Sequence, residues 1–264
     1  MKSWPPTPSR VRRRPRALAI VFALFALSLA PTARAQVSLS ATGETSYRFR
    51  GVDLTNGKPD VRVALSYDHR SGAYGGGAVI IGEGSGGATT AIGYAAYAGF
   101  ARRASNGVTW DAGATTTKVV SELPVAVTYR IQGFLYSQTY IVKYQANYAE
   151  AYVGAAKGPL SAHLYLSPDY LGQGLRTAYL DLNAAVRPTT GVRLFVHAGL
   201  LAPLGDSAPP AVKRERLDLR TGVAVEFRHG EIQLAWTTVT PRADYPTGYP
   251  QKRNALVLSA SAFF

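Results

Sequence analysis

The chain ends on the stretch LVLSASAFF, residues 256–264, whose side chains alternate between two faces of an extended backbone. One face holds leucine and alanine together with Phe264, and the other holds two serines between Val257 and Phe263. Successive side chains of a β-strand point to opposite sides, so alternation at period two predicts a strand that ends the chain.

The same alternation recurs upstream in segments of about eight to fifteen residues, roughly twelve in all. The clearest lie at 178–187, 192–200 and 217–227, where leucine, valine and alanine oppose polar or charged side chains. The first segment is expected to run from 39 to 50, with Tyr47 and Phe49 on its apolar face.

Alternation alone also fits a soluble sheet with one wet face, but strand length and tyrosine placement favour a membrane barrel. Strands of about nine to eleven residues suit a tilted crossing of a bilayer, whereas soluble strands are usually nearer five or six. The chain has 16 tyrosines, many near strand ends, where a half-apolar ring suits the membrane interface.

The joints between these segments alternate between long and short, as in barrels with long outer loops and short periplasmic turns. The long joints lie at 51–60, 82–90, 117–145, 168–175, 202–213 and 241–253. The short joints lie around 70–72, 102–107, 157–159, 187–191 and 228–230, and carry turn residues such as Asn106-Gly107.

We therefore predict an all-β fold, a closed antiparallel transmembrane β-barrel of about twelve strands. Closure is required because an open sheet edge in hydrocarbon would leave backbone groups unpaired. The stretch 123–145 fits a hairpin within the third outer loop, the interpretation we prefer, or two further strands that would give fourteen.

The N-terminus predicts export. Residues 1–16 are basic, 17–30 are apolar without a charge, and Ala33-Arg34-Ala35 supplies a cleavage site, the order found in secretory signal peptides. We thus expect a cleaved signal peptide at 1–35 and a single barrel domain at 36–264. The signal holds seven of the 29 basic residues and none of the 16 acidic ones, so the remainder has a net charge of +6, 22 against 16.

Composition narrows the chemistry further. The chain has no cysteine, which removes disulfides, thiolate metal sites and cysteine nucleophiles. No basic cluster with interleaved aromatic residues remains after the signal, so we expect no nucleic-acid partner. We also expect no cofactor and no metal site.

Several motifs resemble, in order, the TorF-like porin family of proteobacteria. They are SYRFRG at 46–51, NGKP at 56–59, VRVALSY at 61–67, SGAY at 71–74, EAYVG at 150–154, LSPDYLG at 166–172, AYLDLNA at 178–184 and VHAG at 196–199. The resemblance covers nearly all of 36–264, except that the insertion at 118–145 departs from the pattern. It implies an outer-membrane porin and supplies no substrate. The strand ending on Phe264 also resembles the assembly signal of bacterial outer-membrane barrels.

On this interpretation the polar faces of the strands line a pore for passive diffusion of small hydrophilic solutes, and the mild basic excess suggests a preference for anions. The residues expected to line the pore are Glu44, Arg48, Arg50, Arg62, Asp111, Glu150, Asp181, Arg187, Arg193, Asp218, Arg220 and Glu226. The expected partners are outer-membrane lipid, lipopolysaccharide and the barrel assembly machinery.

Two other function classes stay open. Paired lumenal charges could plug a small barrel and leave it a structural or adhesive protein, recognised through loops such as the one carrying Tyr245 and Tyr249. A lipid-modifying enzyme would need a His–Ser pair with an orienting acid on the lipid-facing side. The alternation places His163 and His197 toward the lumen instead, so we expect no enzyme.

Overall fold

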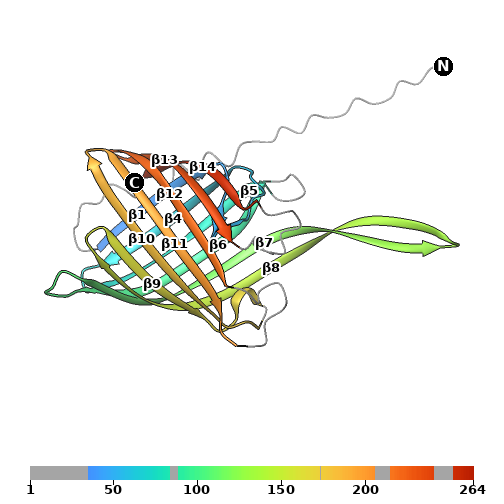
Figure 1. Ribbon diagram of the computed structural model, residues 1–264, viewed down its shortest axis with the longest axis horizontal. Helices are drawn as coiled ribbons and strands as arrows, with labels where there is room; N and C mark the ends of the chain where they lie inside the picture. Colours follow the sequence, from blue (N-terminus) through green and yellow to red (C-terminus); the bar gives the residue numbers. More distant parts are fainter. Residues whose placement is uncertain (1–34, 84–88, 173, 206–214, 241–251) are drawn as a thin grey trace, which may run out of the picture. The chain divides into compact units, whose positions relative to one another are not determined.

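A computed structural model describes residues 35–83, 89–172, 174–205, 215–240 and 252–264 of the protein. Within these residues, twelve strands form one closed antiparallel barrel in which each strand pairs with its neighbour in the chain and the first pairs with the last (Figure 1). The barrel strands are β1 (Ala35–Glu44), β4 (Asp60–His69), β5 (Ala73–Glu83), β6 (Thr89–Arg103), β7 (Thr109–Ile131), β8 (Phe134–Lys157), β9 (Leu160–Ser167), β10 (Thr177–Thr189), β11 (Val192–Pro203), β12 (Arg216–Phe227), β13 (Gly230–Thr240) and β14 (Asn254–Phe263). The predicted fold and the count of twelve are confirmed.

The seam between β1 and β14 closes the barrel. Its register runs from Ser40 opposite Phe263 to Glu44 opposite Ser259. Beyond the last strand residue, the amide of Phe264 donates to the carbonyl of Leu39 at 2.9 Å, and the Leu39 amide donates back at 3.2 Å. The final residue is thus hydrogen-bonded into the seam; its role as an assembly signal stays a prediction.

The two faces of the barrel wall have opposite character. Outward-facing side chains are apolar and exposed, as at Leu180, Leu182 and Val196. The alternate residues Asp181 and His197 point inward and line a cavity. Among the residues that the structure describes, no helix combines the length and apolar character needed to cross a bilayer.

Inside the barrel, the hydroxyl ends of several tyrosine rings lie over glycines of the neighbouring strand. Four lumenal tyrosines do so: Tyr74 over Gly99, Tyr97 over Gly76, Tyr152 over Gly113 and Tyr179 over Gly199. A Cβ atom added to any of these glycines would lie 2.6–2.7 Å from the ring Cζ atom, closer than carbon atoms pack. The missing side chain therefore gives each ring the space to lie along the wall.

The insertion at 118–145 is a hairpin, as preferred. β7 and β8 pair without interruption from Thr109 opposite Ala156 to Ile131 opposite Phe134, and the turn is Gln132-Gly133. On its other edge β7 pairs with β6 only from Thr109 to Val119, so the rest of the hairpin extends past the barrel wall, as Figure 1 shows.

The first strand is shorter than predicted. It ends at Glu44 rather than at residue 50, and residues 45–59, here called the inner loop, fold into the barrel. The inner loop carries the short hairpin of β2 (Arg48–Phe49) and β3 (Val52–Asp53). Tyr47 and Phe49 line the cavity instead of the outer face, so that prediction is wrong.

Polar side chains explain why the strand stops. Ser46 Oγ donates to Asp53 Oδ1 at 3.1 Å, and the Tyr47 amide donates to Thr55 Oγ1 at 3.0 Å. These local bonds compete with the ladder that a longer strand would need. The expected joints 82–90, 202–213 and 241–253 lie wholly or partly outside the described residues, as do Tyr245 and Tyr249.

Candidate functional site

The lumen is the candidate site. It holds a cavity of about 810 Å³, walled by the inward faces of the strands and by the inner loop. Nine of the predicted pore residues line it: Glu44, Arg48, Arg50, Arg62, Asp111, Glu150, Asp181, Asp218 and Arg220. The structure thus brings together residues that the sequence spreads over some 180 positions.

The other three predicted pore residues do not line the cavity and cluster at its edge, toward the opposite end of β12 from Asp218. Arg187 Nε lies 2.9 Å from a carboxylate oxygen of Glu226, and Arg193 Nε lies 2.8 Å from the other oxygen. Arg193 also pairs with Glu231, a residue that sequence reasoning missed. These charges neutralise one another near the short turns and lie away from the inner loop.

The inner loop is buried and internally bonded. Val52, Asp53 and Thr55 are at most 3% exposed. The Thr55 amide donates to Asp53 Oδ1 at 3.0 Å, and Arg48 pairs with the same carboxylate at 3.5 Å. The loop is therefore a small folded unit inside the barrel.

The tip of the inner loop contacts the β12–β13 wall. A Cβ atom on Gly51 would lie 2.7 Å from Val239 Cβ and 2.9 Å from Asp218 Cβ, so the glycine backbone touches this wall directly. On the other side, Arg50 reaches Glu150 of β8 with two hydrogen bonds of 2.8 and 2.7 Å. The loop leaves β1 and returns to β4, and β8 lies five strands from β1 in one direction around the barrel and seven in the other, so the loop crosses the lumen.

Aromatic rings surround the Arg50 guanidinium. Its Cζ atom lies 3.9 Å from the ring centroid of Tyr179, and 5.1 to 5.9 Å from those of Phe49, Tyr165 and Tyr170. Burial disfavours the charge, yet the neighbouring Tyr170, Tyr148 and Glu150 hold the pKa of Arg50 well above its usual range. The arginine is therefore charged, bidentate on a carboxylate and enclosed by rings.

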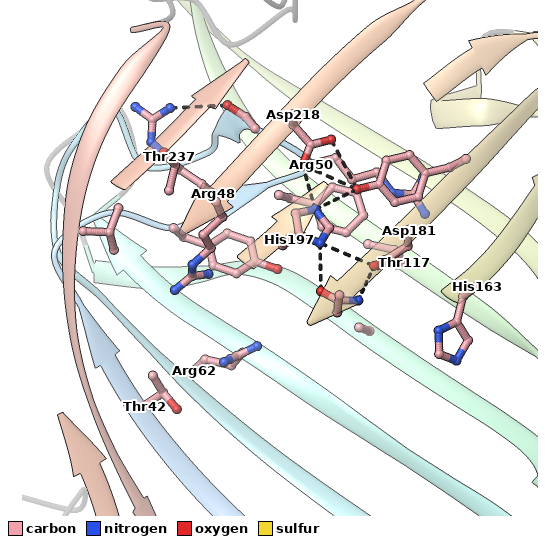
Figure 2. Close-up of a pocket in the computed structure, with 18 of the residues that line it drawn as sticks. Thr42, Arg48, Arg50, Arg62, Thr117, His163, Asp181, His197, Asp218 and Thr237 are labelled. Carbon is pink, nitrogen blue, oxygen red and sulfur yellow. Dashed lines mark hydrogen bonds and ion pairs between the residues drawn. The ribbon is translucent and has the colours of Figure 1, made fainter. Parts of the chain in front are cut away.

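Two histidines organise the acidic part of the wall. His197 Nε2 lies 3.0 Å from Asp218 Oδ1, and its Nδ1 lies 3.4 Å from Asp181 Oδ1 (Figure 2). His163 Nε2 lies 3.3 Å from Asp111 Oδ1. Each of these three carboxylates thus contacts an imidazole, with His197 shared between Asp181 and Asp218.

The arginines of the lumen differ in their partners. Arg48 and Arg50 are bonded to carboxylates, whereas Arg62 and Arg220 have no hydrogen bond or ion pair with any residue that the structure describes. The Nε atom of Arg220 is buried and lacks a hydrogen-bond partner there. Glu44 lies near both but forms no direct ion pair in the same set.

The charge of the lining differs from that of the chain. Its four arginines face six carboxylates, Glu231 among them, so the basic excess of residues 36–264 lies elsewhere. The prediction of anion preference cannot rest on overall charge. It depends instead on which lumenal charges are not paired within the protein and can therefore interact with a solute.

Three of the histidines have defined side-chain partners. His69 Nδ1 lies 2.8 Å from Ser71 Oγ, but both are exposed at the first short turn. His163 and His197 contact carboxylates. No three histidine or acidic side chains, within the ranges given above, are placed to hold a metal ion.

Sequence reasoning missed the rings around Arg50. Tyr165 and Tyr179 lie two residues from His163 and Asp181 and so share their lumenal faces, but alternation assigns them no role, and the pairing of Arg50 with Glu150 joins residues 100 positions apart. One signal was present in the sequence: an arginine precedes Gly51 at a turn, where asparagine or glycine is usual.

Comparison with known proteins gives a family and a fold. A family model described as "Bacterial protein of unknown function (Gcw_chp)" matches residues 30–202. Among solved structures, the NanC porin matches at a TM-score of 0.52 with 9% identity, over 87% of this chain and all of that one. No curated protein matches the sequence.

Two further solved structures are similar at lower scores. The COG4313 outer membrane channel from Pseudomonas putida F1 has a TM-score of 0.44 with 12% identity, over 89% of this chain and 97% of that one. The P. putida toluene transporter TodX has a TM-score of 0.45 with 11% identity, over 90% and 88%. At such identities the likeness to the NanC porin establishes a shared fold alone.

Proposed function

Since the chain belongs to the Gcw_chp family of bacterial proteins and folds as a closed twelve-stranded barrel, we propose that it is an outer-membrane channel. It would serve passive diffusion of small hydrophilic solutes, with a preference for anions. The TorF-like motifs support the same assignment, and the predicted signal peptide at 1–35 supports export.

The outer surface supports the membrane location. Leucine, valine and aromatic side chains are exposed around the barrel, as at Leu65, Val153, Leu194 and Leu258. Such a surface is costly in water and suits hydrocarbon. Outer-membrane lipid and lipopolysaccharide would contact it, and the barrel assembly machinery would recognise the strand that ends at Phe264.

The observation that carries the anion preference is the pair of arginines without partners. Arg48, Arg50, Asp181, Asp218 and most other lumenal charges are matched within the protein. The charges of Arg62 and Arg220 are therefore the ones most available to a permeating ion. Glu44 lies near both arginines and Glu231 lies near Arg220, and these carboxylates reduce the field.

The test is single-channel conductance of residues 36–264 in a planar bilayer with a salt gradient. We expect stepwise conductance and a reversal potential that favours anions. Arg220→Glu and Arg62→Glu should each move the reversal potential toward cations. Arg102→Glu makes the same charge change on an exposed residue that does not line the cavity, and should leave the potential unchanged.

The outcomes separate the parts of the proposal. A wild-type reversal potential that favours cations would sink the anion preference but keep the channel. A folded, heat-modifiable barrel without conductance in any variant would sink the channel itself.

A plugged structural or adhesive barrel is the second candidate, favoured by the inner loop that crosses the lumen. The exposed β7–β8 hairpin would then be the recognition surface. A lipid-modifying enzyme is the weakest alternative, because the described lumenal histidines contact carboxylates rather than a serine.

A further inference from the structure

We propose that Glu150, Tyr165, Tyr170 and Tyr179 form a guanidinium-binding cage whose present occupant is Arg50, and that small guanidinium-bearing solutes compete with Arg50 for it. Occupation by Arg50 keeps the inner loop across the lumen, and its displacement frees the loop. The gating part of this inference rests on the proposed channel function; the binding part does not.

The cage matches the chemistry of a guanidinium group in two ways. Glu150 presents both carboxylate oxygens to the two terminal nitrogens of Arg50, the fork geometry that ammonium cannot reproduce. Tyr179 stacks at 3.9 Å, the distance of a close cation–π contact. A planar, delocalised cation fits between such a carboxylate and such a ring.

Three of the cage residues, Glu150, Tyr165 and Tyr179, lie on the wall strands β8, β9 and β10, and Tyr170 lies in a short 3-10 helix, η2 (Tyr170–Gly172), that follows β9. Tyr170, Tyr179 and Glu150 are at most 3% exposed. Tyr179 Oη lies 3.2 Å from Asp218 Oδ2, and Tyr148 packs against Tyr170 with centroids 5.2 Å apart. Strands β8 and β10 therefore hold most of the site in place whether or not Arg50 occupies it.

Arg50 occupies a turn position that asparagine, aspartate or glycine usually fills, a preference that Gln132 at the tip of the β7–β8 hairpin also breaks. The φ of Arg50 is +49°, and Gly51 follows at +78°, the pattern of a type I′ turn. Asparagine, aspartate or glycine suits the first of these positions, and other residues there store strain. Asn56-Gly57 in the same loop follows the rule, with φ of +55° and +69°. The turn at Arg50 breaks it where the side chain meets Glu150.

The inner loop can move as a unit because its own bonds travel with it. Ser46 bonds to Asp53 and Tyr47 bonds to Thr55 within the loop. The loop is joined to the rest of the barrel at its tip by the Arg50–Glu150 pair and at Arg48, whose Nη1 donates to the carbonyl of Lys252 at 3.0 Å. A tethered guanidinium has an effective concentration on the order of millimolar or higher, so free competitors should act in at least that range.

The binding arm of the test uses Arg50→Ala in detergent, with methylguanidinium chloride as the probe and methylammonium chloride as the matched control. The truncation leaves the buried Glu150 carboxylate without its partner. We expect methylguanidinium to raise the temperature of thermal unfolding in a saturable way, with no such rise from methylammonium. Arg50→Ala/Glu150→Gln should lose the rise.

The channel arm uses the same proteins in planar bilayers. Arg50→Ala should conduct more than wild type, and methylguanidinium should raise the wild-type conductance but not that of Arg50→Ala. Arg50→Lys keeps the positive charge and loses the two-pronged hydrogen bonding to Glu150, so it should fold even if Arg50→Ala does not. Its conductance should rise at lower methylguanidinium concentrations than that of wild type.

The two arms fail differently. Equal effects of methylguanidinium and methylammonium on Arg50→Ala, or on Arg50→Lys if the alanine variant does not fold, would overturn the cage. Binding with no conductance in any protein would overturn the channel and leave the cage standing. Conductance that is identical in wild type, Arg50→Ala and Arg50→Lys would overturn the gating role.

Discussion

The turns Arg50-Gly51 and Gln132-Gly133 have nearly the same backbone and opposite surroundings. Arg50 and Gln132 both have φ of +49°, and a glycine of positive φ follows each. The first turn lies inside the barrel against Glu150 and the β12–β13 wall. The second ends the projecting β7–β8 hairpin, where Phe134 is 70% exposed.

What differs is the set of partners within reach. Arg50 meets a buried carboxylate and four rings, and Gly51 leaves room for the backbone to touch Val239. A Cβ atom on Gly133 would meet nothing within 4 Å. The turn conformation therefore does not determine whether its segment lies inside the barrel. The pairing of Arg50 with the distant Glu150 determines that the inner loop enters the lumen.

The largest contrast is expected from removing each segment. Replacing residues 46–57 with a short Gly-Ser linker should raise single-channel conductance several-fold, because the segment that crosses the lumen is gone. Joining Val120 to Gln145 through an Asn-Gly turn removes the projecting hairpin and keeps the pair that these residues form, so conductance should not change. Equal conductance of the two deletions would show that the inner loop does not obstruct the lumen.

Breaking an ion pair of the inner loop should cost stability according to burial. The side chains of Arg50 and Glu150 are 7% and 2% exposed, so Glu150→Gln should lower the free energy of unfolding by about 3 kcal/mol. The Lys58–Glu83 pair is 40% and 42% exposed, and Glu83→Gln should cost under about 1 kcal/mol. Urea unfolding of both variants in the same vesicles measures the difference. Equal losses of unfolding free energy would contradict the stabilising role of the buried Arg50–Glu150 pair.

Adding one methyl group at each turn gives a smaller contrast. Alanine at a positive φ costs about 1 kcal/mol at either site. Gly51→Ala adds the clash with Val239 and Asp218 and should cost about 2–4 kcal/mol, whereas Gly133→Ala should cost only the backbone part. The same urea titration measures both variants. If Gly51→Ala lowers the free energy of unfolding no more than Gly133→Ala does, the tip of the inner loop can shift away from Val239 and Asp218.

The smallest effect is expected on the projecting hairpin. Tyr136 is 47% exposed and stacks on Tyr129 with centroids 5.8 Å apart. Tyr136→Thr keeps a strand-favouring residue and should lower the free energy of unfolding by no more than about 1 kcal/mol. Conductance should match wild type; a change there would tie this hairpin to the pore.

Local pattern predicted the barrel well because period two is a local property. The faces of 178–187, 192–200, 217–227 and 256–264 are as predicted, and the joint lengths gave twelve strands. The hairpin at 118–145 was also correctly preferred, because two extra strands would have needed another short turn.

The alternation pattern gave wrong predictions where residues far apart in the sequence meet inside the barrel. Alternation gives the face of a strand but not the height of a residue along the barrel, so Arg187, Arg193 and Glu226 were grouped with charges at the other end. It also continued the first strand to residue 50, because alternation ignores the unusual arginine before Gly51 and carries no information about a pairing with Glu150, 100 positions away. The signal boundary at 35 stays a prediction.

Because tyrosine rings lie over glycines, the width of the lumen can be altered by substituting one glycine at a time. Gly113 and Gly199 leave Tyr152 and Tyr179 lying along the wall, so the vacant Cβ positions act as recesses. Alanine at Gly199 would fill the recess and push the ring of Tyr179 into the lumen, whereas alanine at Gly113 would also meet the backbone carbonyl of Ala98. A designer could therefore narrow this barrel by single methyl groups, without changing the number of its strands or their register.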